Sequence, residues 1–122
     1  MLYDSNLLIY LMTGQYPELD AFLLQHPLQV STVTYIEVLG YHALTETDLA
    51  ALGQLFDLAR RYPIDEPIVD QAIALRREQR VSLGDSIVAA TALVHGLSLA
   101  THNVKDFSWI AELDVVDPIG RP

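Results

Sequence analysis

The chain begins with MLYDSNLLIYLM (residues 1–12), in which one carboxylate, Asp4, interrupts an otherwise apolar run. The pattern predicts a short strand over residues 1–4 and a helix over residues 5–13, with Asp4 at their junction. Asp is a good helix N-cap, so a structural capping role is one interpretation of this residue. The other interpretation is that an acid at the end of a strand carries chemistry.

Composition limits the choice of function. The 122 residues suit a single domain over residues 1–122, and the absence of Cys excludes disulfides and thiolate chemistry. A net charge of −9 argues against nucleic-acid binding by charge alone, so a cation would have to mediate contact with a polyanion. No basic-then-apolar leader and no apolar run of roughly 18 residues are found, which predicts a cytoplasmic protein outside the membrane.

Predicted strands and helices alternate along the chain, which indicates an α/β fold with a mostly parallel sheet. In such sheets functional groups gather beyond the carboxyl ends of the strands. Asp4 is expected at such an end. We expect strands over residues 1–4, 28–32, 62–65, 97–101 and 114–117, and helices over residues 5–13, 16–26, 33–44, 45–61, 66–79, 82–96 and 106–113.

Three further acids each have a structural explanation. Glu37 ends the capping pattern Thr34-x-x-Glu37, and Asp85 ends the pattern Ser82-x-x-Asp85. Either Asn103 or Asp106 caps the short helix that follows.

Taken together, these acids also suggest a metal site. A parallel sheet would bring Asp4, Asp85 and Asp106 to one edge, where carboxylates repel each other and are hard to keep ionised. A hard divalent cation such as Mg²⁺ or Mn²⁺ prefers oxygen ligands and would offset the repulsion. Phosphoryl transfer is the chemistry that such a site serves.

Four blocks of the sequence resemble the signature blocks of PIN-domain ribonucleases, and more closely the toxins of VapBC toxin–antitoxin pairs. They are MLYDSNLLIYL (residues 1–11), VTYIEVLG (33–40), LGDSIVAATAL (83–93) and LATHNVKDF (99–107). The resemblance implies a three-layer fold with a central parallel five-stranded sheet flanked by helices. It also implies a metal-dependent endoribonuclease, acting as the toxin of a type II pair and using Mg²⁺ or Mn²⁺. A tRNA or rRNA substrate, a cognate antitoxin and a homodimer complete the expectation.

The resemblance assigns catalytic and metal-binding roles to Asp4, Glu37, Asp85 and Asp106. Many PIN domains carry Asp where this chain has the neutral Asn103, which leaves open whether Asn103 or Asp106 fills the fourth acidic position and whether one ion binds or two. The supporting residues expected around the acids are Ser5, Thr101 and Asn103.

Basic residues near these blocks are candidate RNA contacts. Arg76 and Arg80 share a helix face, and His102 lies inside the fourth block. The alternative for the arginines is a solvated face paired with acids such as Glu78. Trp109 is assigned to the core or an interface rather than to base stacking.

Two other functions are compatible with parts of the sequence. A PIN-like binding module without catalysis is compatible with the neutral Asn103. A phosphatase of the haloacid dehalogenase type also places Asp after its first strand, but it requires Asp-x-Asp where this chain has Asp4-Ser5-Asn6.

Overall fold

The computed structural model describes residues 1–120 and contains a five-stranded, all-parallel sheet in the order β3-β2-β1-β4-β5. Leu2 pairs with Gln29 on one side and with Leu99 on the other, so β1 is the central strand. The predicted five-stranded parallel sheet is therefore confirmed. The predicted domain of residues 1–122 includes residues 121 and 122, which lie outside the described part. The strands are β1 (Leu2–Tyr3), β2 (Gln29–Ser31), β3 (Arg60–Tyr62), β4 (Leu99–Ala100) and β5 (Val115–Val116).

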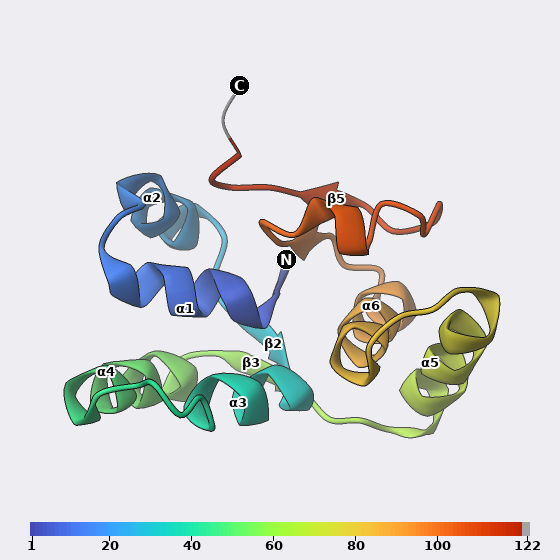
Figure 1. Ribbon diagram of the computed structural model, residues 1–122, viewed down its shortest axis with the longest axis horizontal. Helices are drawn as coiled ribbons and strands as arrows, with labels where there is room; N and C mark the ends of the chain where they lie inside the picture. Colours follow the sequence, from blue (N-terminus) through green and yellow to red (C-terminus); the bar gives the residue numbers. More distant parts are fainter. Residues whose placement is uncertain (121–122) are drawn as a thin grey trace.

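Helices cover both faces of this sheet in two groups, and Figure 1 shows α5 and α6 on one side with α1 to α4 on the other. None of the helices within residues 1–120 combines the length and the apolar character needed to cross a membrane. The helices are α1 (Ser5–Thr13), α2 (Pro17–Gln25), α3 (Thr32–Leu39), α4 (Glu46–Asp57), α5 (Glu66–Glu78) and α6 (Leu83–His95), with a 3₁₀ turn, η1, at Val104–Asp106.

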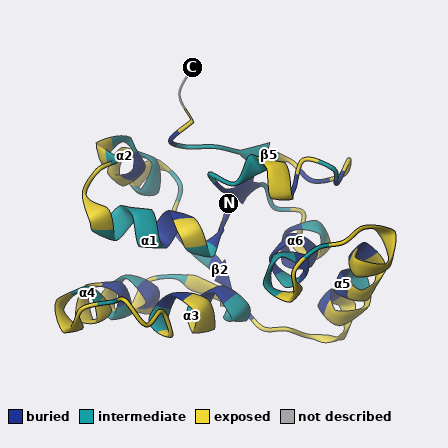
Figure 2. Cartoon of the chain, in the orientation of Figure 1, coloured by how far each residue is buried: buried dark blue, intermediate teal, exposed yellow. Residues whose placement is uncertain are grey.

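Alternate residues of the central strands face opposite sides of the sheet and build two cores. Leu2 and Leu99 pack with the α5 and α6 side chains, whereas Tyr3 and Ala100 pack with the side chains of α1 to α4. Figure 2 shows the same division, with buried inner helix faces and exposed outer faces. Because side chains alternate between the two faces, a helical layer packs on each face of the sheet. The fold therefore has three layers, as predicted.

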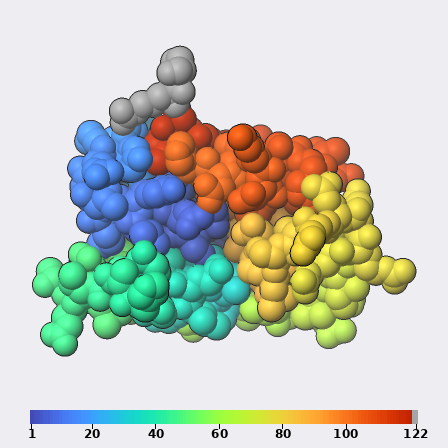
Figure 3. Space-filling view, in the orientation of Figure 1, coloured from blue at the N-terminus to red at the C-terminus, as the bar shows by residue number. Residues whose placement is uncertain are grey.

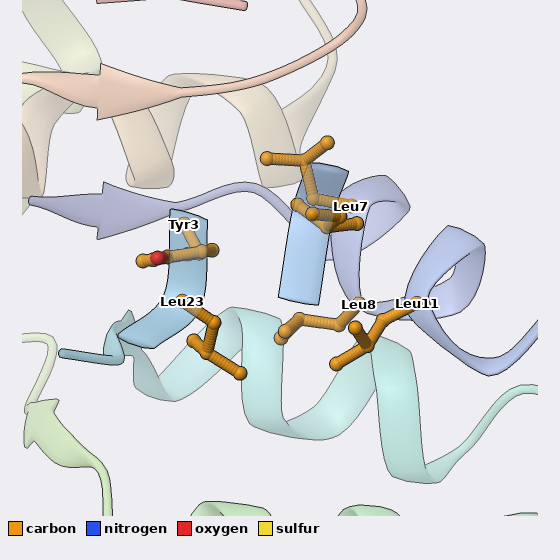
Figure 4. Close-up of a pocket in the computed structure, with 6 residues that line it drawn as sticks. Tyr3, Leu7, Leu8, Leu11 and Leu23 are labelled. Atoms are coloured by element: carbon orange, nitrogen blue, oxygen red, sulfur yellow. The ribbon is translucent and has the colours of Figure 1, made fainter. Parts of the chain in front are cut away.

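The core between α1 and α2 is dry. Tyr3 lies against leucines of both helices, as Figure 4 shows, and the space among these side chains does not admit a water molecule. These residues therefore form a packed core and not a ligand site. The side chains that line the space are Tyr3, Leu7, Leu8, Leu11, Leu19 and Leu23.

Local signals explain where most helices begin and end. The Thr45 hydroxyl accepts a hydrogen bond from Asp48 N at 3.0 Å and caps α4, as the sequence predicts. Pro67 lies in the first turn of α5, where its missing N–H is not needed. Gly96 ends α6 in the left-handed conformation, with φ of 63°.

The predicted bounds of three elements are wrong. The strand predicted over residues 62–65 is β3 at Arg60–Tyr62, because Pro63 has no N–H to continue a ladder. Consequently α4 ends at Asp57 instead of residue 61. The helix predicted over residues 33–44 spans Thr32–Leu39 and stops at Gly40, whose N–H bonds back to Ile36 O at 2.9 Å.

The helix predicted over residues 106–113 is also wrong. The segment instead forms successive three-residue turns, in which Phe107 N bonds to Val104 O and Ile110 N bonds to Phe107 O, each at 3.1 Å. Leu113 N continues this spacing by bonding to Ile110 O. The buried Phe107, Ile110 and Leu113 recur every third residue, so the apolar pattern fits three-residue turns better than α-helical spacing.

Candidate active site

Asp4 lies at the carboxyl end of β1, where the chain order of the sheet reverses between β1 and β4. Its side chain is only 4% exposed, and its two oxygens are both held. Oδ1 accepts a hydrogen bond from Ser5 N at 2.8 Å, and Oδ2 accepts one from Thr101 Oγ1 at 2.8 Å. Asp4 is the N-cap of α1, so the capping interpretation is confirmed without removing the acid from the pocket.

The electrostatics of Asp4 are unusual for a capping residue. Burial raises the pKa of the Asp4 carboxyl to about 6, against an opposing contribution from the Thr101 hydrogen bond. The negative charges of Asp85 and Glu37 raise this pKa further. A buried carboxyl surrounded by other acids is a common feature of functional sites.

The remaining acids extend this cluster outward from Asp4. Asp85, in the first turn of α6, has its pKa raised by burial and then by the negative charges of Asp106 and Glu37. Glu37, on the exposed side of α3, accepts a hydrogen bond from Ser5 Oγ at 2.7 Å on Oε1. The charges of Asp85 and Glu37 thus act on Asp4, and the charge of Asp106 acts on Asp85.

The capping alternatives have different outcomes. Ser82 caps α6 and its Oγ accepts a hydrogen bond from Asp85 N at 3.1 Å, as the sequence pattern predicts. The pattern Thr34-x-x-Glu37 is not a capping box, because Ser31 is the N-cap of α3 and Thr34 lies inside the helix. Glu37 therefore has no capping function to explain its position.

The three supporting residues also lie at the cluster. Ser5 bonds to both Asp4 and Glu37, through its N–H and its hydroxyl respectively. Thr101 is fully buried, donates to Asp4 and accepts a hydrogen bond from Asn103 N at 3.0 Å. Asn103 precedes η1 and is linked to Asp4 through this Thr101 hydroxyl.

Gly84 is a site residue that sequence reasoning missed. A Cβ at this position would lie 2.6 Å from Glu37 Oε2, so the missing side chain makes room for the Glu37 carboxylate. The signal was available in the sequence, because Gly84 immediately precedes Asp85 in the third block.

A polar pocket of about 300 Å³ adjoins the acids. Asp85 and Asp106 form one part of its lining, and Arg80, Lys105 and Trp109 form another. The pocket is completed by Gln79, Val81 and Ser82.

The other two candidate RNA contacts lie elsewhere. Arg76 is exposed in the last turn of α5 and does not line this pocket. His102 Nδ1 lies 3.1 Å from Asp117 Oδ2, and the ring packs edge-on against Tyr10. The ion pair with Glu78 considered for the arginines is not formed within residues 1–120.

Comparison of the sequence with known protein families shows that the PIN domain family model matches residues 1–113. The chain belongs to the PIN domain family. Ribonuclease VapC10 of Mycobacterium tuberculosis is 31% identical over 93% of this chain and 90% of that protein. Ribonuclease VapC1 of Rickettsia felis is 51% identical over 41 residues, which span 32% of this chain and 31% of that protein.

One solved structure resembles this chain in both fold and sequence. A chain of a toxin–antitoxin complex from Klebsiella pneumoniae is 33% identical, with a TM-score of 0.81 and coverage of 96% of each chain. The three-layer PIN fold expected from the four sequence blocks is thus confirmed.

The donor chemistry of this PIN domain fits a hard divalent cation. The candidate ligands are carboxylate oxygens. Burial, and to a lesser extent mutual repulsion, raises the pKa of Asp4 and Asp85, and a bound cation would offset both effects. Within residues 1–120, no three His, Cys, Asp or Glu side chains are arranged so that they could hold an ion between them. The residues therefore fit a divalent cation in ligand type and charge, but these positions do not form a complete ligand set.

Proposed function

We propose that this PIN domain is a metal-dependent endoribonuclease that acts as the toxin of a type II toxin–antitoxin pair. One observation carries the proposal: beside the reversal point of a parallel sheet, Asp85 and Glu37 raise the pKa of the buried Asp4, and Asp106 and Glu37 raise that of Asp85. The near full-length similarity to ribonuclease VapC10 supports the same reaction class. The substrate is RNA, with tRNA or rRNA as the first candidates.

In this proposal Asp4, Glu37, Asp85 and Asp106 hold Mg²⁺ or Mn²⁺. Such an ion, when bound, neutralises charge that develops on the phosphate and makes a water more acidic. Asp4 is buried and fixed by its two hydrogen bonds, whereas Glu37 and Asp106 are exposed, and Glu37 is held by the Ser5 hydroxyl. Asp106 is proposed for the fourth acidic position because its charge acts on Asp85.

The protein's own residues prepare the site for hydrolysis of a phosphodiester. Thr101 and Ser5 are positioning residues that orient the carboxylates of Asp4 and Glu37. A pocket carboxylate accepts the proton that the attacking water releases, and water adds to phosphorus as the bond to the leaving oxygen breaks. The chain is also proposed to be a homodimer made of one PIN domain per protomer.

A cognate antitoxin is the proposed protein partner. The Klebsiella pneumoniae relative is part of a toxin–antitoxin complex. This chain also has an apolar groove of about 290 Å³ beside α1, lined by residues that include Ile9, Met12, Tyr41 and Leu44. Exposed apolar surface of this kind is a common feature of protein-binding sites.

RNA cleavage by the purified protein tests the proposal. The protein is incubated with a tRNA and rRNA pool in Mg²⁺, Mn²⁺ or EDTA, and the cut ends are mapped. Asp85→Asn is the test variant. Asp57→Asn is the matched control, because Asp57 is exposed at the end of α4 and does not line the acidic pocket. Discrete cuts that disappear with EDTA and with Asp85→Asn are expected, whereas cuts that persist in both would overturn the proposal.

The second candidate is a PIN-like binding module without catalysis. The neutral Asn103 and the incomplete ligand set within residues 1–120 favour it. Calorimetric titration with Mn²⁺ separates the two functions. Heat that is lost with Asp4→Asn supports the nuclease, and no heat from folded wild-type protein supports the binding module.

A further inference from the structure

We propose that the pocket between the end of α5 and η1 binds one nucleotide of single-stranded RNA beside the cleavage site. Its base stacks on Trp109 and its phosphate lies between Arg80 and Lys105. This inference rests on the proposed ribonuclease function and adds a substrate-binding site to it.

The pocket is formed by two segments that are distant in sequence. Residues 79–82 and 85 form one wall, and residues 105, 106 and 109 form the other. Figure 3 shows the segment near residue 80 lying against the segment near residue 105 on the molecular surface. The volume of about 300 Å³ is at the lower end of the range for small-ligand sites, which suits a single nucleotide better than a longer segment.

Two cations in the pocket are available to a phosphate. Arg80 and Lys105 are both exposed, and among residues 1–120 neither forms an ion pair with a carboxylate. They are two of only seven basic residues in a chain of net charge −9. The positive charges of Arg80 and Lys105 therefore lie next to the acids of the candidate active site. There they can attract the phosphate backbone of RNA, which the rest of this acidic protein repels.

Trp109 provides the stacking surface. The sequence assigns this residue to the core or an interface, but the structure places only part of it against the core while it also lines the pocket. Its Nε1 donates a hydrogen bond to Asp106 O at 3.0 Å, which fixes the ring relative to the acid. Aromatic rings held beside basic side chains bind single-stranded bases with little dependence on sequence.

The arrangement also orients the RNA. Arg80, Lys105 and Trp109 line the same pocket as Asp85 and Asp106, so a nucleotide held by the first group places the adjoining phosphate near the acids. Bases in a duplex are stacked on each other and cannot reach Trp109. The site therefore selects single-stranded loops over helical RNA.

Fluorescence offers a site-specific test, because Trp109 is the only tryptophan in the chain. The full-length protein in EDTA is titrated with a six-nucleotide single-stranded RNA, and a gel checks that the RNA stays intact. Saturable quenching of Trp109 is expected. An abasic oligonucleotide of the same length and poly-glutamate are the control probes, because both carry negative charge without bases. Equal quenching by either control would overturn the nucleotide assignment.

Variants of the two cations give the second readout. Arg80→Gln and Lys105→Gln are each expected to weaken RNA binding and to reduce the slope of log K against log salt by about 0.7. Arg77→Gln is the matched control, because Arg77 is exposed on α5 but does not line the pocket. An unchanged salt slope in both test variants would contradict the inference.

Cleavage kinetics separate this inference from the proposed function. Trp109→Leu is expected to raise KM about tenfold by removing one base stack, while Trp109→Phe retains most of the binding. Cleavage with an unchanged KM in Trp109→Leu, Arg80→Gln and Lys105→Gln would contradict the nucleotide site but still support the proposed ribonuclease function. Base-dependent quenching in a protein that cuts no RNA would support the site and overturn the proposed function.

Discussion

Thr101 Oγ1 donates a hydrogen bond of 2.8 Å to Asp4 Oδ2, joining residues that are 97 positions apart in sequence. Both residues follow central strands, Asp4 after β1 and Thr101 after β4. The bond stabilises the ionised carboxylate and keeps the pKa of Asp4 lower than burial alone would set it. The ionisation of Asp4 thus depends on the pairing of β1 with β4.

Replacing Thr101 by Val should move the pH dependence of RNA cleavage. Without the donor, the pKa of Asp4 rises above about 6, so the acidic limb of the pH–rate profile shifts to higher pH. Loss of a hydrogen bond to a charged group is also expected to lower the free energy of unfolding by about 1.5–3 kcal/mol. Thr91→Val is the control, because Thr91 is equally buried but bonds to Ile87 O instead. A pH profile that shifts equally in both variants would contradict this interpretation.

Asp4→Asn should abolish cleavage and leave the protein as stable at pH 7, or more stable. Burial raises the Asp4 pKa from 3.8 to about 6, so between these pH values the folded protein binds more protons than the unfolded chain. The contribution of Asp4 to stability is therefore full below pH 3.8 and is lost as the pH rises through 6. The stability of Asp4→Asn relative to wild type should increase over this window by about 3 kcal/mol, and chemical unfolding at several pH values measures it. Marked unfolding of Asp4→Asn at pH 7 would favour a structural role alone.

Gly84→Ala should reduce cleavage without unfolding the protein. The new Cβ would lie 2.6 Å from Glu37 Oε2, at the end of a flexible side chain, so the carboxylate is displaced and its bond from Ser5 is lost. Thermal unfolding and kcat are measured together. Gly53→Ala is the control, because a Cβ there has no neighbour within 4 Å and α4 should gain about 1 kcal/mol. A Gly84→Ala variant with full activity would mean that the position of Glu37 does not matter.

Binding of Mn²⁺ should strengthen between pH 5 and pH 7.5. The ion competes with the proton on Asp4, whose pKa is about 6, and with the proton on Asp85, whose pKa is also raised. Calorimetry in buffers of different ionisation enthalpy measures both affinity and proton release. Affinity that does not change with pH in wild type would argue against Asp4 and Asp85 as ligands.

Thr34→Val is expected to raise the free energy of unfolding by about 1 kcal/mol. Within residues 1–120 the buried Thr34 Oγ1 has no hydrogen-bond partner, so the hydroxyl is desolvated without compensation. Val has nearly the same shape and removes that penalty. A lower thermal midpoint for Thr34→Val would show that the hydroxyl is in fact stabilising.

Local sequence signals determined most of the helices. Thr45 and Ser82 cap their helices and Pro67 lies in a first turn, because capping and backbone geometry involve only neighbouring residues. The alternation of strands and helices indicated the parallel sheet, and four motif blocks identified the family. The helix predicted over residues 106–113 was wrong, because its apolar residues recur every third position and form successive three-residue turns instead.

Only the tertiary structure decided which side chains meet. The strand order β3-β2-β1-β4-β5 places β1 between β2 and β4, and this pairing brings Thr101 to Asp4. Packing of α3 against α1 and α6 likewise brings Glu37 to Ser5 and Gly84. The pocket with Arg80, Lys105 and Trp109 also arises from packing of distant segments. The sequence motifs identified the acids, because residue identity is read directly from the chain. The pKa of Asp4, in contrast, depends on its burial and on charges from other elements, which the tertiary structure decides.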